Sequence, residues 1–247
     1  MKIKFFNSSV FVLTAILAWV SLISGCAAQS GTTRSPAQGS GARQAVPEKA
    51  ATVNSVLMDP ARASETAPDK FQAKFITTKG DFVVEVSRTW APNGADRFYS
   101  MCRSGYFKDI AIFRSIKDFM FQFGIHGDPA VSAKWMESNI EDDKSVGISN
   151  TRGTLSFAQT GRPNSRSVQM FVNTGNNAFL DKARGGGAPF VPFGKIVRGI
   201  GVIQKIHVTG ENEPDVQGKF KQGGNDYIET KYPNADYIRS VEVSVIN

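Results

Sequence analysis

The chain has 247 residues, of which 41% are hydrophobic and 21% charged, and these proportions are ordinary for a globular protein of one or two domains. Its net charge of +7 is scattered rather than gathered into a basic stripe with interleaved aromatic residues, so we expect no nucleic-acid partner. Two cysteines and two histidines, far apart in sequence, leave little material for a metal site, and we expect neither a metal nor another cofactor.

The first residues carry the pattern of an export signal. Lys2 and Lys4 give a positive start, and residues 10–23 form a nearly unbroken apolar run. This run has about the length of a signal-peptide core and is short for a membrane span. We therefore predict that residues 1–25 are a signal peptide.

The apolar run ends in Leu22-Ile23-Ser24-Gly25-Cys26, which resembles the bacterial lipobox: an aliphatic residue, two small residues and a lipid-accepting cysteine. The resemblance implies a lipoprotein signal peptide, lipidation of Cys26 and an anchor in a membrane, because lipoproteins carry several acyl chains. Ordinary cleavage near Ala28 and an uncleaved anchor are the alternatives. Ala27, which follows Cys26 where an aspartate would retain the protein, favours the outer membrane and a location facing the periplasm.

Residues 26–69 are rich in serine, glycine, alanine, proline, glutamine and threonine. Such a composition cannot bury enough apolar surface to fold by itself. We predict a flexible linker after the lipidated Cys26, with a root-mean-square span on the order of 35–40 Å. Within it, residues 53–63 are compatible with a short helix.

Ordered structure is expected over residues 70–247. Apolar and polar residues alternate over residues 71–75 and again over residues 82–86, on either side of the turn Lys79-Gly80-Asp81. Alternation with a period of two on both sides of a glycine-containing turn predicts a β-hairpin.

A helix is predicted to begin at Pro92 and to end before Gly105, because the apolar residues between them fall on one helical face. A second short helix is predicted over residues 200–207. Further strands are predicted over residues 110–116, 119–123, 154–158, 169–173, 191–197 and 240–245. Many short strands with two helices predict a mainly β fold, a closed eight-stranded antiparallel β-barrel capped by two α-helices.

Familiar catalytic signatures are missing from the sequence. It has no Gly-x-Ser-x-Gly elbow and no phosphate-binding Walker loop, and Gly199-Ile200-Gly201 lacks the third glycine of a dinucleotide fingerprint. His126 and His207 each stand alone, and we interpret both as structural. Any chemistry therefore has to come from the two motif-dense stretches, residues 112–129 and 156–172.

In the first stretch an arginine stands five residues before Phe119-Met120, a glutamine follows two residues after the methionine, and Gly127-Asp128 lies beyond. The second stretch contains Gln169-Met170-Phe171, and Phe193-Gly194 follows it. This ordered series resembles the cyclophilins, a family of peptidyl-prolyl cis/trans isomerases. The resemblance runs from about residue 71 to the C-terminus and implies that residues 70–247 are a cyclophilin-like isomerase domain.

The resemblance also implies a site, residue by residue. Arg114 matches the catalytic arginine of the family, and Gln122 matches the glutamine that hydrogen-bonds beside it. Phe179 stands where many eukaryotic members carry a tryptophan, and Phe190 stands where the family has a groove histidine. The substrate-binding residues that the resemblance implies are Phe119, Met120, Ala158, Gln159, Gln169, Phe171, Phe179 and Leu180.

The residue types alone leave a second interpretation open. Phe119, Phe121, Phe123 and Phe171 are aromatic residues of the kind that usually fill a core, and Arg114 in an apolar strand could simply reach solvent. The resemblance to the cyclophilins favours a substrate groove over this interpretation.

An X–Pro bond rotates over a barrier of about 18–20 kcal/mol and needs no nucleophile or metal to do so. The resemblance therefore implies an isomerase of X–Pro bonds that assists the folding of extracytoplasmic proteins. We expect a monomer with two kinds of partner, proline-containing polypeptides and, through its lipid, a membrane. The alternatives are a non-catalytic proline-peptide-binding or chaperone module on the same tether, and a structural lipoprotein docked to the cell wall.

Overall fold

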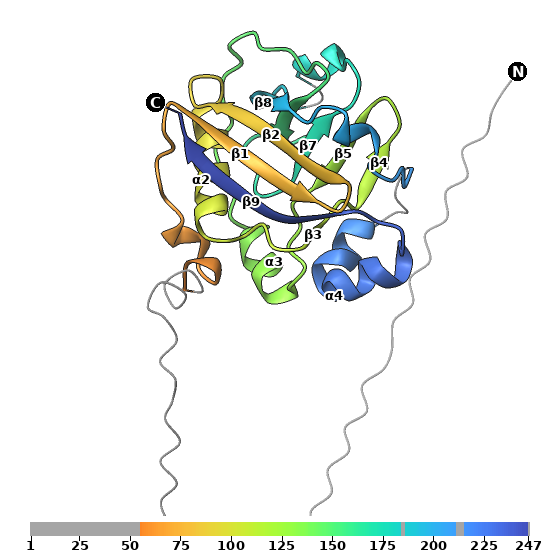
Figure 1. Cartoon of the computed structure of the whole chain (residues 1–247). Helices are drawn as coiled ribbons and strands as arrows, with labels where there is room; N and C mark the ends of the chain where they lie inside the picture. Colours follow the sequence, from red (N-terminus) through yellow and green to blue (C-terminus); the bar gives the residue numbers. More distant parts are fainter. Residues whose placement is uncertain (1–54, 184–185, 211–214, 247) are drawn as a thin grey trace, which may run out of the picture. The chain divides into compact units, whose positions relative to one another are not determined.

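The computed structural model describes residues 55–183, 186–210 and 215–246, and their strands form one antiparallel sheet (Figure 1). The strand order in this nine-stranded sheet is β3-β9-β1-β2-β8-β6-β7-β5-β4. The strands are β1 (Lys70–Thr77), β2 (Gly80–Ser87), β3 (Ile110–Ala111), β4 (Arg114–Ile116), β5 (Met120–Phe123), β6 (Thr154–Phe157), β7 (Met170–Asn173), β8 (Pro192–Arg198) and β9 (Tyr237–Val245).

The predicted closed eight-stranded barrel is wrong. The strand expected over residues 110–116 is divided into β3 and β4, and the two parts pair with different neighbours. Ile110 of β3 lies opposite Ile238 of β9, whereas Arg114 of β4 lies opposite Gln122 of β5. Because β3 and β4 form the two edges of the sheet, the strands make a curled half-barrel rather than a closed one. In Figure 1, β9, β1 and β2 pass in front of β7 and β5.

The predicted β-hairpin is confirmed as β1 and β2, which pair along their whole length. The first predicted helix is confirmed as α2 (Pro92–Arg103), and Gly105 follows it with a positive φ of 74°. The second predicted helix is wrong, since the structure has only the 3-10 turn η3 (Val202–Gln204) there.

Two α-helices that the sequence pattern did not predict are α3 (Pro129–Trp135) and α4 (Val216–Lys231). The two pack against each other below the sheet (Figure 1). The remaining short turns are η1 (Pro60–Arg62) and η2 (Ala178–Asp181). Residues 55–57 are also helical, within the span 53–63 where the sequence was compatible with a short helix. The longer helices of the described chain are α2, against β8 and β9, and the pair α3 and α4 at one end of the sheet (Figure 1).

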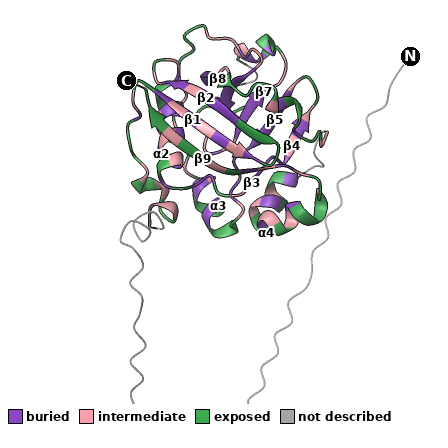
Figure 2. Cartoon of the chain, in the orientation of Figure 1, coloured by how far each residue is buried: buried purple, intermediate pink, exposed green. Residues whose placement is uncertain are grey.

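The main core lies on the inner face of the curled sheet, and its buried residues follow the strands in Figure 2. Phe75 and Phe82 stack with ring centroids 4.7 Å apart, and Phe98 of α2 lies 5.9 Å from Phe75. Phe121 and Phe123 also belong to this core. Since β-strand side chains alternate between faces, the intervening residues of β5 point to the outer face.

Residues 55–69, which we had assigned to the flexible linker, contact the domain. The indole Nε1 of Trp135 donates to the carbonyl of Leu57 at 2.7 Å, and Ala67 N donates to Asp96 Oδ1 at 2.9 Å. A boundary at residue 69 therefore cuts through a packed segment. The predicted signal peptide, Cys26 and the rest of the linker lie outside the described residues. Within the described part of the chain, no helix is long and apolar enough to cross a membrane.

Candidate active site

The register of the sheet places the two predicted catalytic residues side by side. Arg114 of β4 lies directly opposite Gln122 of β5, and Gln122 lies opposite Phe171 of β7. Directly opposed residues of antiparallel strands point to the same face. Arg114, Gln122 and Phe171 thus form one line across three strands on the outer face, and Arg114 Nη1 donates to Gln122 Oε1 at 3.3 Å.

A second apolar cluster, separate from the main core, covers this outer face. Met120, Phe171 and Leu180 are its buried members, and Phe119 and Phe190 are among the partly buried residues packed against them. The Phe171 and Phe190 rings meet edge to face with centroids 5.6 Å apart. The structure therefore separates the aromatic residues that the sequence left ambiguous: some fill the main core, and others line the outer face.

The outer cluster is hollowed into a first cavity of about 200 Å³. Its wall combines an apolar part with one guanidinium and three amide side chains. The lining residues are Arg114, Phe119, Met120, Gln122, Ala158, Gln159, Phe171, Leu180, Phe190 and Gln217. Eight of the ten residues that we predicted as catalytic or substrate-binding thus surround one cavity, and the two exceptions are Gln169 and Phe179.

A second cavity of about 130 Å³ adjoins the first and shares part of its wall. Gln169, predicted to bind substrate, lines this second cavity rather than the first. Phe179 lines neither, is 46% exposed, and stacks on Phe119 with ring centroids 5.8 Å apart. Phe179 therefore supports the rim from outside.

Leu180 and Phe190 form the part of the first cavity's wall that follows β7. Asp181, the last residue of η2, holds this part of the wall in place. Asn150 donates to Asp181 Oδ1 from both its backbone N and its Nδ2 at 2.8 Å, and Ser149 donates to Oδ2. Burial alone would raise the pKa of Asp181, but these hydrogen bonds outweigh it and lower the pKa. Asn150 Nδ2 also donates to the carbonyl of Phe190, so Asn150 links Asp181 to Phe190.

Two lining residues were absent from the predicted site. Phe190 was noted only as a replacement for a histidine, although its ring completes the outer cluster. Gln217 comes from α4, a helix that the sequence pattern did not reveal. No local motif marks Gln217, since only the packing of α4 on Phe113 and its neighbours brings this residue to the cavity.

The chemistry available in the first cavity is limited to hydrogen bonding, a positive charge and apolar contact. Among the residues that the structure describes, no three His, Cys, Asp or Glu side chains gather in a way that could hold a metal. An apolar hollow with a guanidinium at its edge suits a small apolar ring joined to a polar backbone group. Fold and site together define a mainly β protein with two adjoining cavities, the first of them on the outer face of its sheet.

Comparisons with known proteins agree on one family. The family model described as cyclophilin type peptidyl-prolyl cis-trans isomerase/CLD matches residues 72–225, more than half of the chain. The peptidyl-prolyl cis-trans isomerase of Acinetobacter baylyi is 33% identical over 130 residues, which are 53% of this chain and 68% of that relative. Isomerase B of Escherichia coli is 33% identical over 136 residues, which are 53% of this chain and 81% of that relative.

The fold has solved counterparts as well. The crystal structure of a cyclophilin type peptidyl-prolyl cis-trans isomerase from Cryptosporidium parvum aligns with a TM-score of 0.53 at 21% identity, covering 72% of this chain and 99% of that one. The chain therefore belongs to the family of cyclophilin-type peptidyl-prolyl cis-trans isomerases.

Proposed function

We propose that this chain accelerates the cis/trans isomerisation of X–Pro bonds in polypeptides, with the proline ring in the first cavity and Arg114 as the catalytic residue. The observation that carries the proposal is the position of the Arg114 guanidinium, on the rim of an apolar hollow and 3.3 Å from Gln122. Family membership supports the same reaction.

The reaction needs a group that prefers the twisted amide to either planar form. In the twisted state the amide loses resonance, and the proline nitrogen gains a lone pair that can accept a hydrogen bond. A guanidinium is always charged and holds its donors in a rigid fork, so Arg114 can donate to that nitrogen. Because the contact forms only when the bond is twisted, it lowers the barrier without stabilising the ground state.

The remaining residues orient the substrate and shield the contact. Met120, Phe171 and Leu180 would hold the proline ring and exclude water, which strengthens a hydrogen bond from a charged donor. Gln122 accepts from Arg114 with Oε1, and this contact holds the guanidinium toward the cavity. Gln159 is fixed in turn, since its Nε2 donates to the carbonyl of Ala188.

We further propose that the enzyme works outside the cytoplasm, as a lipoprotein anchored through Cys26 to the outer membrane and facing the periplasm. The support is the sequence Leu22-Ile23-Ser24-Gly25-Cys26 after an apolar run, with Ala27 behind it. Uncatalysed X–Pro rotation takes tens of seconds at 25 °C and limits the folding of many exported chains. A tethered isomerase would act on such chains as they leave the export machinery.

The catalytic proposal is tested by NMR exchange spectroscopy on a short X–Pro peptide with the full-length chain. We expect accelerated cis/trans exchange, and a loss of at least about a hundredfold in kcat/KM for Arg114→Ala, which equals about 2.7 kcal/mol. Arg198→Ala, on the exposed end of β8, is the matched control and should retain the wild-type rate. Equal rates for both variants would contradict the role of Arg114.

The anchoring proposal is tested separately by metabolic labelling with palmitate. Label should enter the wild-type chain and not a Cys26→Ser variant, and the variant should leave the membrane fraction. Equal labelling of both would show that Cys26 does not carry the lipid.

A further inference from the structure

Gln217, in the first turn of α4, ends a chain of side-chain hydrogen bonds that begins at Arg114. Gln122 Nε2 donates to Gln169 Oε1 at 2.7 Å, and Gln169 Nε2 donates to Gln217 Oε1 at 2.9 Å. We call Gln122, Gln169 and Gln217 the glutamine row. It crosses from β5 to the position before β7 and then to α4, three segments far apart in sequence.

The members of the glutamine row differ in how many of their amide nitrogen and oxygen atoms already make hydrogen bonds. Gln122 is engaged at both ends of its amide, by Arg114 and by Gln169, and Gln169 is engaged at both ends by its two neighbours in the row. Gln217 accepts through Oε1, while its Nε2 has no hydrogen-bond partner among the described residues. The unused donor of the row therefore lies at its outer end.

That outer end borders both cavities, because Gln217 lines the first and the second alike. Besides Ala158, the described residues that line the second cavity have amide or hydroxyl side chains, and none of these described residues is charged or aromatic. Its lining residues are Gln122, Ala158, Gln159, Thr160, Ser165, Ser167, Gln169 and Gln217. A peptide with proline in the first cavity would therefore place a neighbouring side chain among uncharged polar groups.

The position of Gln217 is fixed by the packing of its helix. Phe220, one turn further along α4, is fully buried, and Asn225 N donates to the carbonyl of Gly127 at 3.0 Å. At Gly224 the chain leaves the helical conformation with φ 60° and ψ −154°, so α4 is two helical segments joined by a kink. A Cβ at Gly224 would come within 2.2 Å of the same carbonyl, so this kink approaches the loop more closely than any side chain allows. Gln217 therefore lies on the first segment of α4, which is held by the buried Phe220 and, at its far end, by the kink at Gly224.

We propose that Gln217 is a specificity-determining residue, which selects peptides whose residue beside the X–Pro bond carries an uncharged hydrogen-bonding side chain such as asparagine, glutamine, serine or threonine. An oxygen of that side chain accepts from Gln217 Nε2. An apolar side chain would not make this hydrogen bond, and a charged one would find no opposite charge among the described residues that line the second cavity. The inference rests on the proposed isomerase function.

The test uses the full-length chain and two series of X–Pro peptides, in which the residue on one side or the other of the bond is asparagine, leucine, aspartate or lysine. NMR titration gives Kd for each peptide, and exchange spectroscopy gives kcat/KM. For the wild type we expect the asparagine peptide of one series to be preferred over the other three, by about threefold or more for a single hydrogen bond.

The variants Gln217→Glu and Gln217→Ala then report on the residue itself. Gln217→Glu should move the preference toward the lysine peptide by up to about fivefold and away from the aspartate peptide, as an exposed ion pair would. Gln217→Ala should flatten the ranking. Gln222→Glu, which adds the same charge at an exposed position of the same helix, is the matched control and should keep the wild-type ranking.

Two outcomes overturn the inference: a wild type that ranks the four peptides equally, or Gln217 variants that keep the wild-type ranking. Failure of the proposed function is seen in a different readout, as peptides that bind without faster exchange. Accelerated exchange with an unchanged ranking would therefore reject the role of Gln217 alone.

Discussion

Phe220 of α4 packs edge to face on Phe113, with ring centroids 5.8 Å apart and an interplanar angle of 70°. Both rings are fully buried, in a small core that also holds Ala111, Ile125 and Ile228. Phe113 directly precedes Arg114, so the helix supports the strand that carries the guanidinium. Helix α4 therefore contacts the site at two places: Phe220 packs on Phe113, the neighbour of Arg114, and Gln217 lines the first cavity.

Phe220→Ala should therefore lower both stability and activity. Removing a buried phenylalanine costs about 3–5 kcal/mol, and urea unfolding would measure that loss. The exchange rate of an X–Pro peptide should also fall, under conditions where the variant is still folded, because Phe113 loses its partner.

Phe220→Leu provides the comparison, since it keeps most of the apolar contact and should cost less on both counts. A Phe220→Ala variant that loses stability but keeps the wild-type kcat/KM would show that α4 does not support Arg114.

Phe171 and Val172 are neighbours in β7 that face opposite sides of the sheet, and this alternation makes a matched pair of variants. Phe171 lines the first cavity, whereas Val172 belongs to the main core. Phe171→Ala should weaken the binding of an X–Pro peptide by about tenfold, the value of one aromatic contact. Val172→Ala should lower the unfolding free energy and leave Kd unchanged, and NMR titration of both variants would check this. The same Kd for Phe171→Ala and the wild type would remove Phe171 from the binding site.

The sheet and the candidate site follow from the sequence to different degrees. The β-hairpin and the C-terminal strand could be predicted because alternation is a local pattern. The division of residues 110–116 could not, since it depends on Ile238, which pairs with Ile110 from far along the chain. The closure of a barrel is decided by such distant pairings.

The residues of the candidate site also differ in how well the sequence predicts them. Arg114 and Gln122 are eight residues apart and meet across a hairpin, so a motif in the sequence captures them. Gln217 enters from α4, whose helical periodicity is weakened by Gly218, Gly223 and Gly224. The roles assigned to these residues remain predictions, and the structure adds that they surround adjoining cavities.

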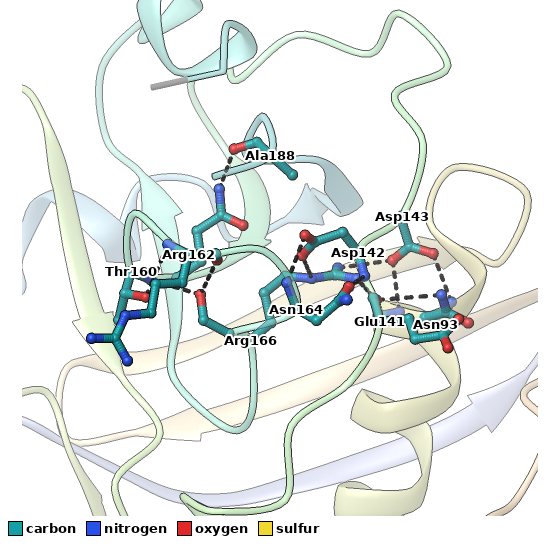
Figure 3. Close-up of polar contacts among 12 residues, drawn as sticks. Asn93, Glu141, Asp142, Asp143, Thr160, Arg162, Asn164, Arg166 and Ala188 are labelled. Carbon is teal, nitrogen blue, oxygen red and sulfur yellow. Dashed lines mark hydrogen bonds and ion pairs between the residues drawn. The ribbon is translucent and has the colours of Figure 1, made fainter. Parts of the chain in front are cut away.

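Arg166 joins the loop beside the second cavity to the start of α2 through a buried ion pair (Figure 3). Its Nη1 lies 2.8 Å from Asp143 Oδ2, and Asp143 also accepts from the backbone N of Asn93 and of Gly94. Breaking a buried pair from one side costs about 3–5 kcal/mol, because the other charge stays buried. Arg166→Met should therefore destabilise the chain by about that amount in urea unfolding.

The control is Arg162→Met, on the same loop, where the side chain is exposed and the change should stay within about 0.5 kcal/mol. The double variant Arg166→Met with Asp143→Asn should cost less than the two single changes together, as a coupled pair requires. Strict additivity in this cycle would mean that the ion pair contributes nothing.

His126 gives the stability of the chain a dependence on pH. The ring is buried against Tyr106, with centroids 5.0 Å apart, and its Nδ1 accepts from Asp128 N at 3.0 Å. Burial lowers the pKa of His126 below the ordinary value of 6.5, although the charge of Asp128 opposes this. Above pH 6.5 the ring is neutral in both states, and its contribution to stability is complete.

As the pH falls below 6.5, the unfolded chain takes up a proton before the folded chain does, and the free energy of unfolding falls until the folded pKa is passed. Each unit by which the pKa is lowered corresponds to about 1.4 kcal/mol. Urea unfolding from pH 7.5 to pH 5 should show this loss in the wild type and in His207→Asn, where the exposed His207 is the matched control. His126→Asn keeps an acceptor for Asp128 N but cannot titrate, so its stability should change less over the same range. Parallel curves for His126→Asn and the wild type would assign the loss to other groups.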